Sequence, residues 1–293
     1  MTTLFSFSST RLALGCAAVA LVASSCTQNP PGPTIVETAA VTPEAVNSSI
    51  MPYGSYRTLV WSDEFDGASL NNQKWGPEIK DVWYNNELQA TTNSRSNLAV
   101  TNGNLTITAQ RETYHGRDYT SARINTKGLR DFTFGRIDVR AKLPKGKGIW
   151  PAIWMLGSND SQVSWPACGE IDIMELRGSS PGVNVSTLHF GNSVATKPQP
   201  LSTTYSLPGG GDFSQAYHTF SIIRAQDKTE WYVDSVKYFT TTQAEAAPYP
   251  FNNPFYMILN VAVGGDFDGN PDGSTSFPQQ MLVDYVRYYK YKE

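Results

Sequence analysis

The segment 169–176, which reads GEIDIMEL, contains three carboxylates within six consecutive residues. Side chains alternate between the two faces of a β-strand, so that Glu170 and Asp172 would share one face. Strict alternation would place Glu175 on the opposite face, but a β-bulge near Met174 would return it to the first. With that bulge, we expect all three carboxylates to line one face of one strand.

Such a row of carboxylates could hydrolyse a glycosidic bond. A retaining glycosidase needs a nucleophile and an acid/base whose carboxyl groups are about 5 Å apart, and the side chains of Glu170 and Glu175 can lean together to reach that separation. Asp172 could hold the nucleophile by a hydrogen bond, and its charge would make Glu175 harder to ionise. That effect suits a general acid, which must carry its proton when substrate arrives.

A solvated acidic strand and a calcium site are the two alternatives for this segment. Against simple solvation, apolar Ile and Met residues alternate with the carboxylates, and Trp165-Pro166 and the run GIWPAIWML precede them. Burying carboxylates in such surroundings costs free energy unless they are paired, which favours a catalytic use.

The composition predicts an all-β domain with many turns. The 293 residues include 7 Trp, 15 Tyr and 13 Phe beside 23 Gly and 18 Pro; aromatic residues favour strands, whereas Gly and Pro favour turns. The aromatic residues suit a carbohydrate groove, because sugar rings pack on aromatic faces, but a sandwich core would use them equally well. The net charge of −3 gives no indication of the excess positive charge that nucleic-acid-binding proteins carry.

Short strand candidates, separated by turn residues, follow one another along the chain. The segment 135–143 alternates apolar and polar residues, which predicts one buried and one solvated face. The segment 229–239 is typical of two strands around an Asp234-Ser235 turn. Further strands are expected at 104–110, 255–263 and 281–289. Helical periodicity is nearly absent, so that we expect a sandwich of two antiparallel sheets.

The N-terminal part of the chain predicts export. Residues 1–25 are typical of a signal peptide whose apolar run is too short to span a bilayer. Residues 26–55 form a Pro- and Thr-rich stretch that we interpret as a flexible tether, and residues 56–293 form one catalytic domain.

Two cysteines remain outside the signal peptide. Cys26 lies at a junction that resembles a bacterial lipoprotein site, although Ala23 stands where such sites usually carry Leu. Two alternatives remain: a cell-surface lipoprotein with a membrane-attached lipid on Cys26, or a secreted protein whose signal peptide is simply cleaved. Cys168 is the only cysteine of the domain, which predicts a small buried side chain and no internal disulfide.

Six segments in order along the chain resemble glycoside hydrolase family 16, namely WSDEF, GRIDVRAKLPKGKGIWPAIWML, WPACGEIDIME, STLHFG, FYMILNVAVGG and MLVDYVRYY. They extend from about Val60 to Tyr289 and are most similar to bacterial laminarinases, which are endo-acting β-1,3-glucanases. The resemblance implies a β-jelly-roll sandwich with a substrate cleft on its concave face and a retaining double displacement.

The resemblance also implies roles for single residues. Glu170 matches the nucleophile, Asp172 its assisting carboxylate and Glu175 the acid/base. The residues that match substrate-binding positions are Trp150, Trp154, Trp165, His189, Arg123 and Asn86. A core role for the histidine, and surface or turn roles for the arginine and the asparagine, are the alternatives.

The resemblance further implies a structural calcium ion and no cofactor for catalysis. The pattern assigns the ion to Glu64, the carbonyl of Gly103 and Asp284 on the convex face, where oxygen ligands from both chain ends would suit a hard cation. An exposed turn at Glu64 is the alternative.

Two features fall outside the family pattern. Residues 266–273 carry acidic side chains spaced as in an EF-hand, but Phe277 occupies the twelfth position and no helices flank the loop, so that we interpret it as a polar loop at the cleft rim. Arg224 stands where relatives often have Trp. If that Trp supports the outer sheet, the change is harmless; if it contacts sugar, a distal subsite is altered.

The expected function is endo-hydrolysis of β-1,3-glucan by an exported monomer. Mixed-linkage glucan, agar and carrageenan are alternative substrates, because relatives that act on them share the carboxylate motif and differ in their cleft loops. A non-catalytic glucan-binding protein is the third alternative. Such proteins lose catalytic carboxylates, whereas this chain retains all three.

Overall fold

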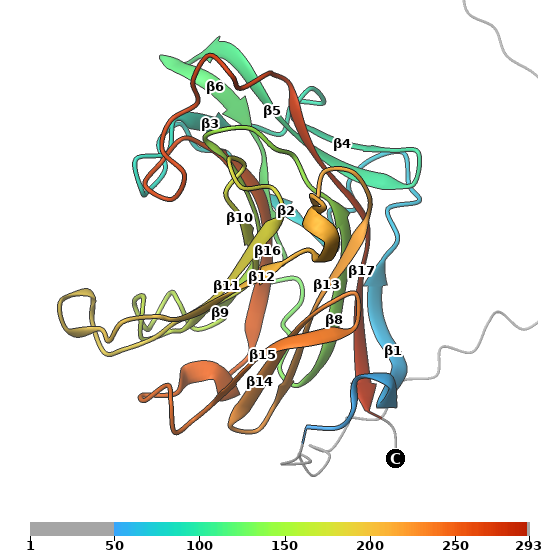
Figure 1. Cartoon of the computed structure of the whole chain (residues 1–293), viewed down its shortest axis with the longest axis vertical. Coiled ribbons are helices and arrows are strands. Elements are labelled where there is room, and N and C mark those ends of the chain that lie inside the picture. Colours follow the sequence, from blue (N-terminus) through green and yellow to red (C-terminus); the bar gives the residue numbers. More distant parts are fainter. Residues whose placement is uncertain (1–49, 292–293) are drawn as a thin grey trace, which may run out of the picture. The chain divides into compact units, whose positions relative to one another are not determined.

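A computed structural model describes residues 50–291, most of which lie in β-strands or in the loops between them (Figure 1). The predicted signal peptide, Cys26 and most of the predicted tether lie outside these residues. Between residues 50 and 291, no helix combines the length and the apolar character needed to cross a membrane.

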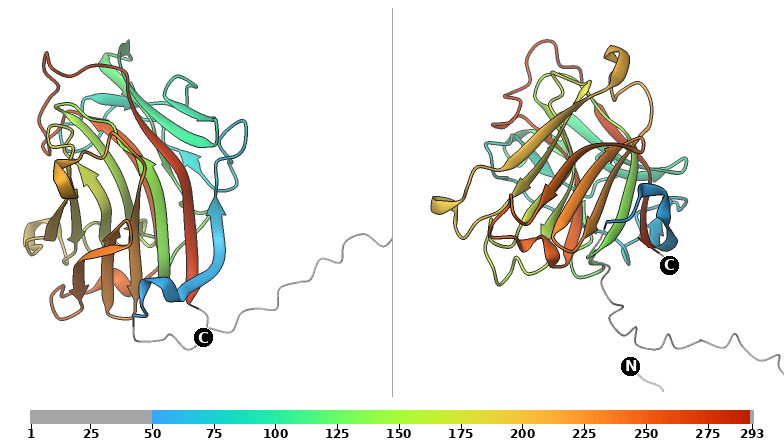
Figure 2. Two further views of the ribbon diagram at one scale, coloured as in Figure 1. Left: turned by 45° about the vertical axis from the view of Figure 1, so that its right-hand side comes forward. Right: turned by 60° about the horizontal axis from the view of Figure 1, so that its bottom comes forward.

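Ten strands form the larger sheet, in the order β15-β14-β13-β8-β17-β5-β6-β3, with β1 paired to β17 and β4 paired to β5. Figure 2 shows β1 beside β17, so that the first and last described strands are neighbours. Their bounds are β1 (Tyr56–Asp63), β3 (Gln89–Thr91), β4 (Leu98–Thr101), β5 (Asn104–Tyr114), β6 (Arg117–Ser121), β8 (Gly135–Lys142), β13 (His218–Ala225), β14 (Lys228–Val233), β15 (Val236–Thr242) and β17 (Gln279–Tyr291).

Seven strands form the smaller sheet, in the order β12-β11-β10-β9-β16-β7-β2, and every neighbouring pair in it is antiparallel. Their bounds are β2 (Gly76–Pro77), β7 (Arg123–Asn125), β9 (Ile149–Gly157), β10 (Glu170–Leu176), β11 (Val183–His189), β12 (Leu201–Ser206) and β16 (Phe255–Val263). The described helices are four single 3₁₀ turns, η1 (Tyr53–Ser55), η2 (Val194–Thr196), η3 (Pro208–Gly210) and η4 (Pro250–Asn252).

The two sheets pack face to face, as Figure 1 shows, and the core lies between them. The smaller sheet contributes Ile171 and Met174 of β10, and the larger sheet contributes Phe220 and Trp231, all of them at most 1% exposed. Each such side chain contributes about 1.5–3 kcal/mol by leaving water. The predicted all-β sandwich of two sheets is confirmed.

Strand β8 departs from the prediction of one buried and one solvated face. Its polar residues Arg136 and Asp138 are also buried, at 9% and 5% exposure, and they form an ion pair at 3.1 Å. These residues are buried because the segment before β1 packs over them. The ring of Tyr53 lies 4.2 Å from the guanidinium carbon of Arg136. The packed domain therefore includes residues from position 50 onward that the sequence analysis assigned to the tether.

The other predicted strands are present. The hairpin of β14 and β15 turns at Asp234 and Ser235, whose φ angles of 48° and 68° are those of a two-residue hairpin turn. The predicted strand 255–263 coincides with β16, and 104–110 and 281–289 fall within β5 and β17.

Candidate active site

A β-bulge places the three carboxylates of β10 on one face. The pairing of β10 with β9 shifts its register between Asp172 and Met174, and the pairing with β11 shifts between Asp172 and Glu175. The bulge predicted near Met174 is therefore confirmed. It returns Glu175 to the side of Glu170 and Asp172, and all three carboxylates line one cleft.

Side chains satisfy two backbone carbonyls that the bulge frees from the ladder. The indole N–H of Trp231, from the opposite sheet, donates to the carbonyl of Asp172 at 3.0 Å. The hydroxyl of Ser186 in β11 donates to the carbonyl of Ile173 at 2.8 Å. A buried carbonyl without a partner would cost about 1–3 kcal/mol. These contacts therefore fix the bulge and, with it, the arrangement of the carboxylates.

The start of β10 depends on a glycine. Gly169 has a φ of +85°, and a Cβ at this position would lie 2.7 Å from Cγ of Pro250, so that only glycine fits. Arg224 holds the neighbouring turn η4, because its Nη2 donates to the carbonyls of Phe251 at 2.6 Å and Asn253 at 2.7 Å. Arg224 is buried and does not line the cleft, which favours the first of the two alternatives for this position, a structural role.

A cleft of about 920 Å³ lies on the face of the smaller sheet that turns away from the core. Five of the six predicted substrate-binding residues line it, namely Trp150, Trp154, Trp165, His189 and Arg123. Asn86 is not among the lining residues, and its role in substrate binding stays a prediction. Its exposed side chain donates to Oδ1 of Asp266 at 2.8 Å and so holds the rim loop, whereas the preceding Asn85 lines the cleft.

Burial dominates the electrostatics of the three carboxylates. It raises the pKa of Glu170, Asp172 and Glu175, each to about 8, and the charge of Asp172 raises the pKa of both glutamates further. His189 opposes this, with its Nε2 lying 3.6 Å from Oε1 of Glu170 and 3.4 Å from Oδ2 of Asp172. The cluster therefore retains protons near neutral pH and titrates as a group, as a general acid in this site requires.

Trp150 is tied to the third carboxylate. Its indole N–H donates to Oε1 of Glu175 at 3.0 Å, and its ring stacks on Phe267 with a centroid separation of 4.9 Å. The guanidinium carbon of Arg177 lies 3.9 Å from the ring centroid of Phe267. The orientation of Glu175 thus depends on an aromatic residue of the loop 266–273.

That loop is only partly the polar rim that the sequence predicts. Asp266 and Phe267 line the cleft, but Asp268 is buried at 5% exposure. Its Oδ2 accepts the backbone N–H groups of Gly148 at 2.8 Å and Ser179 at 3.1 Å. The Asp268 carboxylate therefore anchors the loop, and the anchor holds Phe267 against Trp150.

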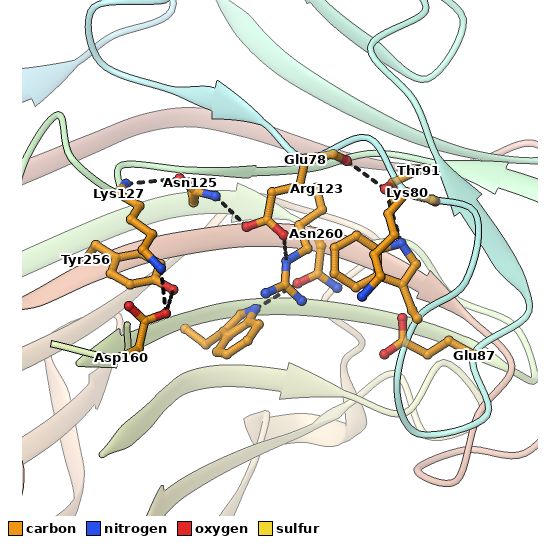
Figure 3. A network of polar contacts seen from close by, with 12 residues as sticks. Glu78, Lys80, Glu87, Thr91, Arg123, Asn125, Lys127, Asp160, Tyr256 and Asn260 are labelled. Carbon is orange, nitrogen blue, oxygen red and sulfur yellow. Dashed lines mark hydrogen bonds and ion pairs between the residues drawn. The ribbon is translucent and has the colours of Figure 1, made fainter. Parts of the chain in front are cut away.

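Arg123, which Figure 3 shows beside Glu78, lies between two tryptophans at another part of the cleft. Its guanidinium carbon is 4.5 Å from the ring centroid of Trp83 and 4.7 Å from that of Trp154. Its Nε pairs with Oε2 of Glu78 at 3.0 Å, while the indole N–H of Trp154 donates to Asn260 at 2.7 Å. Trp154 is therefore held both at its edge and over one ring face.

Comparison with known proteins assigns the family. Residues 85–287 match the profile of the glycosyl hydrolases family 16, and a beta-glucanase of Rhodothermus marinus is 39% identical over 251 residues, covering 80% of this chain and 86% of that protein. The chain belongs to glycoside hydrolase family 16. The predicted family is confirmed, and the two-sheet sandwich is the β-jelly-roll of that family.

Two further relatives of this family 16 protein define how much of the chain is shared. Glucan endo-1,3-beta-glucosidase A1 of Niallia circulans is 40% identical over 257 residues, which cover 79% of this chain but only 38% of that longer protein. The solved laminarinase catalytic domain of Thermotoga maritima is 43% identical, with a TM-score of 0.76, and covers 80% of this chain and 99% of that domain.

Several cleft residues of this family 16 protein escape the sequence analysis. Asn260 is the one polar residue within FYMILNVAV, and Arg177 follows Glu175 by two positions. Both positions could therefore have been predicted to face the cleft from the sequence. Tyr84 and Phe267 also line the cleft. They lie outside the strands, where side-chain periodicity gives no direction.

Two of the three residues predicted to bind calcium have arginine partners. Glu64 pairs with Nη2 of Arg287 at 2.8 Å, and Asp284 pairs with Nη1 of Arg140 at 2.5 Å. Each guanidinium supplies positive charge beside a carboxylate that the calcium prediction uses, and the calcium site stays a prediction. Cys168 is fully buried, as predicted, and burial raises the pKa of its thiol to about 11.

Proposed function

We propose that this family 16 member is a retaining endo-β-1,3-glucanase. The observation that carries the proposal is the bulged strand β10, which directs Glu170, Asp172 and Glu175 into one aromatic-lined cleft. The cleft volume of about 920 Å³ is at the upper end of ligand sites and leaves room for more than one sugar ring. Support for the β-1,3 linkage comes from relatives that are endo-1,3-beta-glucosidases.

In the proposed first step, Glu170 attacks the anomeric carbon and the bond to the leaving glycosidic oxygen breaks. Glu175 donates its proton to that oxygen, and a covalent glycosyl-enzyme forms. Burial keeps Glu175 protonated for this role. His189 lies 3.6 Å from Glu170 and favours its ionised, nucleophilic form.

In the second step, Glu175 acts as a base. It removes a proton from water, whose oxygen attacks the anomeric carbon and releases Glu170, so that the product keeps the β configuration. Asp172, at 3% exposure, remains between the two glutamates. Trp150 positions Glu175 in both steps through its indole N–H.

Reducing-sugar release from laminarin, lichenan, agarose and carrageenan tests the substrate. We expect laminarin to be hydrolysed fastest, with a series of oligosaccharides early in the reaction because the cleavage is internal. Faster hydrolysis of one of the other polymers would replace β-1,3-glucan as the substrate. Laminarin binding without hydrolysis of any polymer would contradict the enzymatic function and support a glucan-binding protein.

We further propose that the protein is exported and that Cys26 carries a lipid at the cell surface. The support is the N-terminal sequence, in which an apolar run of signal length, residues 12–23, ends three residues before this cysteine. The mass of the mature N-terminal peptide distinguishes a lipidated Cys26 from a simply cleaved, secreted form.

The bond from Trp150 to Glu175 should set the basic limb of the pH–rate profile. The indole N–H stabilises ionised Glu175 and lowers its pKa, so that Trp150→Phe should raise it. Because the acid/base must be protonated, the basic limb of kcat/KM for laminarin should move to higher pH, by up to about one unit. The rate on the plateau should also fall, since Glu175 loses its anchor.

Trp154→Phe is the matched control, because its indole N–H donates to Asn260 rather than to a carboxylate. We expect a lower kcat/KM for laminarin with an unchanged basic limb. An unshifted limb in Trp150→Phe, or an equal shift in both variants, would show that this hydrogen bond does not control the acid/base.

A further inference from the structure

Three potential metal ligands meet at the nucleophile end of the cleft. Glu170, Asp172 and His189 each offer one ligand atom, and these three atoms all lie within 4.8 Å of one another. Glu170 and His189 are direct partners across β10 and β11. The rigid backbone pairing of two neighbouring strands therefore holds the donor set together.

The carboxylate of Asp172 gives a second, independent indication. The residue is 3% exposed, yet among residues 50–291 its Oδ2 has no hydrogen-bond partner. This oxygen points toward Nε2 of His189, 3.4 Å away. A buried carboxylate oxygen is costly unless it is paired or bound to a metal, and the His189 ring nitrogen beside Oδ2 is itself a potential ligand, so that the two atoms could bind one cation together.

The two distances from His189 to the carboxylates and the chemistry of the donors indicate the kind of cation. A tetrahedral ion with bonds of about 2.0–2.1 Å to nitrogen and oxygen has its ligands about 3.4 Å apart. Nε2 of His189 lies 3.4 Å from Oδ2 of Asp172 and 3.6 Å from Oε1 of Glu170. Imidazole with carboxylates suits zinc and its neighbours, whereas calcium takes six to eight oxygen ligands.

We propose that Glu170, Asp172 and His189 form a binding site for a divalent transition metal such as Zn²⁺, and that the bound metal inhibits the enzyme. Three protein ligands leave a fourth position for water, and the ion can enter from the cleft, because the side chains of Glu170 and His189 are 20% and 23% exposed. The metal would occupy a carboxylate oxygen of Glu170, the proposed nucleophile, and so compete with its attack on the sugar. Inhibition, unlike metal binding itself, rests on the proposed function.

Calorimetric titration of the untagged protein with zinc chloride tests the site. We expect Asp172→Asn and His189→Gln each to weaken zinc binding by at least about tenfold. Cobalt(II) supplies a second measurement, since its visible absorption bands report coordination by the protein. Those bands should appear in the wild type and fade in both variants, while circular dichroism verifies that each variant is folded.

His115→Gln is the matched control. His115 is exposed and lies 3.2 Å from a single carboxylate, Asp81, so that this variant should bind zinc like the wild type. The proposal is overturned if wild-type protein binds no zinc, if both active-site variants bind it as tightly as the wild type, or if His115→Gln removes the binding.

The inhibition is measured separately. Zinc should raise the apparent KM for laminarin, and a chelator should restore the rate. Inhibition without an effect on KM would contradict competition at Glu170. If laminarin is not the substrate, calorimetry and cobalt absorption still decide whether the metal binds, so that failure of the proposed function and failure of the metal site give different results.

Discussion

Glu170→Ala should abolish laminarin hydrolysis and leave the fold intact. The side chain faces the cleft and is 20% exposed, so that its removal opens no core cavity. It also relieves repulsion with Asp172, which raises the pKa of Glu170. Turnover should fall by about 10⁴-fold or more, as for other catalytic nucleophiles. Initial rates and the melting temperature, measured together, check both parts of this expectation.

Azide distinguishes a lost nucleophile from a damaged site. In Glu170→Ala, azide can occupy the space of the carboxylate and displace an activated β-linked leaving group in one inverting step. The product should be an α-glycosyl azide, identified by NMR. Glu64→Ala, at the surface pair with Arg287, should keep normal hydrolysis. A β-azide, or wild-type activity in Glu170→Ala, would remove Glu170 from the nucleophile role.

The arrangement of the carboxylates was predictable because two constraints met in one short segment. Because side chains alternate along β10, Ile171 faces the core and Asp172 faces the cleft. Hydrolysis by two carboxyl groups requires Glu175 to lie on the same face as Asp172. Only a bulge meets both constraints, so that residue spacing sufficed. The partner that fixes the bulge, Trp231, comes from the opposite sheet. Pairing across sheets leaves no periodic signal in a sequence.

Predictions from sequence are weakest where a residue depends on a segment far away in the chain. The polar face of β8 alternates as a solvated face would, and only the packing of Tyr53 over Arg136 shows that it is buried. Asn86 reads as a cleft residue, but its left-handed φ of 57° and its bond to Asp266 direct it to the rim. Both placements depend on contacts between residues more than 80 positions apart.

The loop 266–273 shows how such contacts also set chemistry. From the sequence alone, its acidic residues predict a solvated loop at the cleft rim. In the fold, buried Asp268 anchors the loop, Phe267 covers Trp150 and Trp150 donates to Glu175. A loop about ninety residues beyond Glu175 in the sequence therefore supports the proposed acid/base, which explains how loop changes could tune activity on an unchanged carboxylate strand.

Glu175→Ala should lose activity in a way that depends on the leaving group. Hydrolysis of laminarin needs a proton on the departing oxygen, so that its rate should fall by about 10²–10⁴-fold. An aryl β-glucoside oligomer with an acidic phenol leaves without that proton, and its first step should be far less impaired. The second step then lacks its base, so that a burst of phenol should precede slow turnover.

Azide should accelerate that slow step in Glu175→Ala, because it needs no base to attack the glycosyl-enzyme. Its attack comes from the face opposite Glu170 and should give a β-glycosyl azide, the anomer not expected from Glu170→Ala. The basic limb of the pH profile should also disappear, since the group that must stay protonated is gone. Identical azide anomers from the two variants, or equal losses on laminarin and on the activated glycoside, would contradict the division of labour between the two glutamates that the bulge of β10 brings to one face.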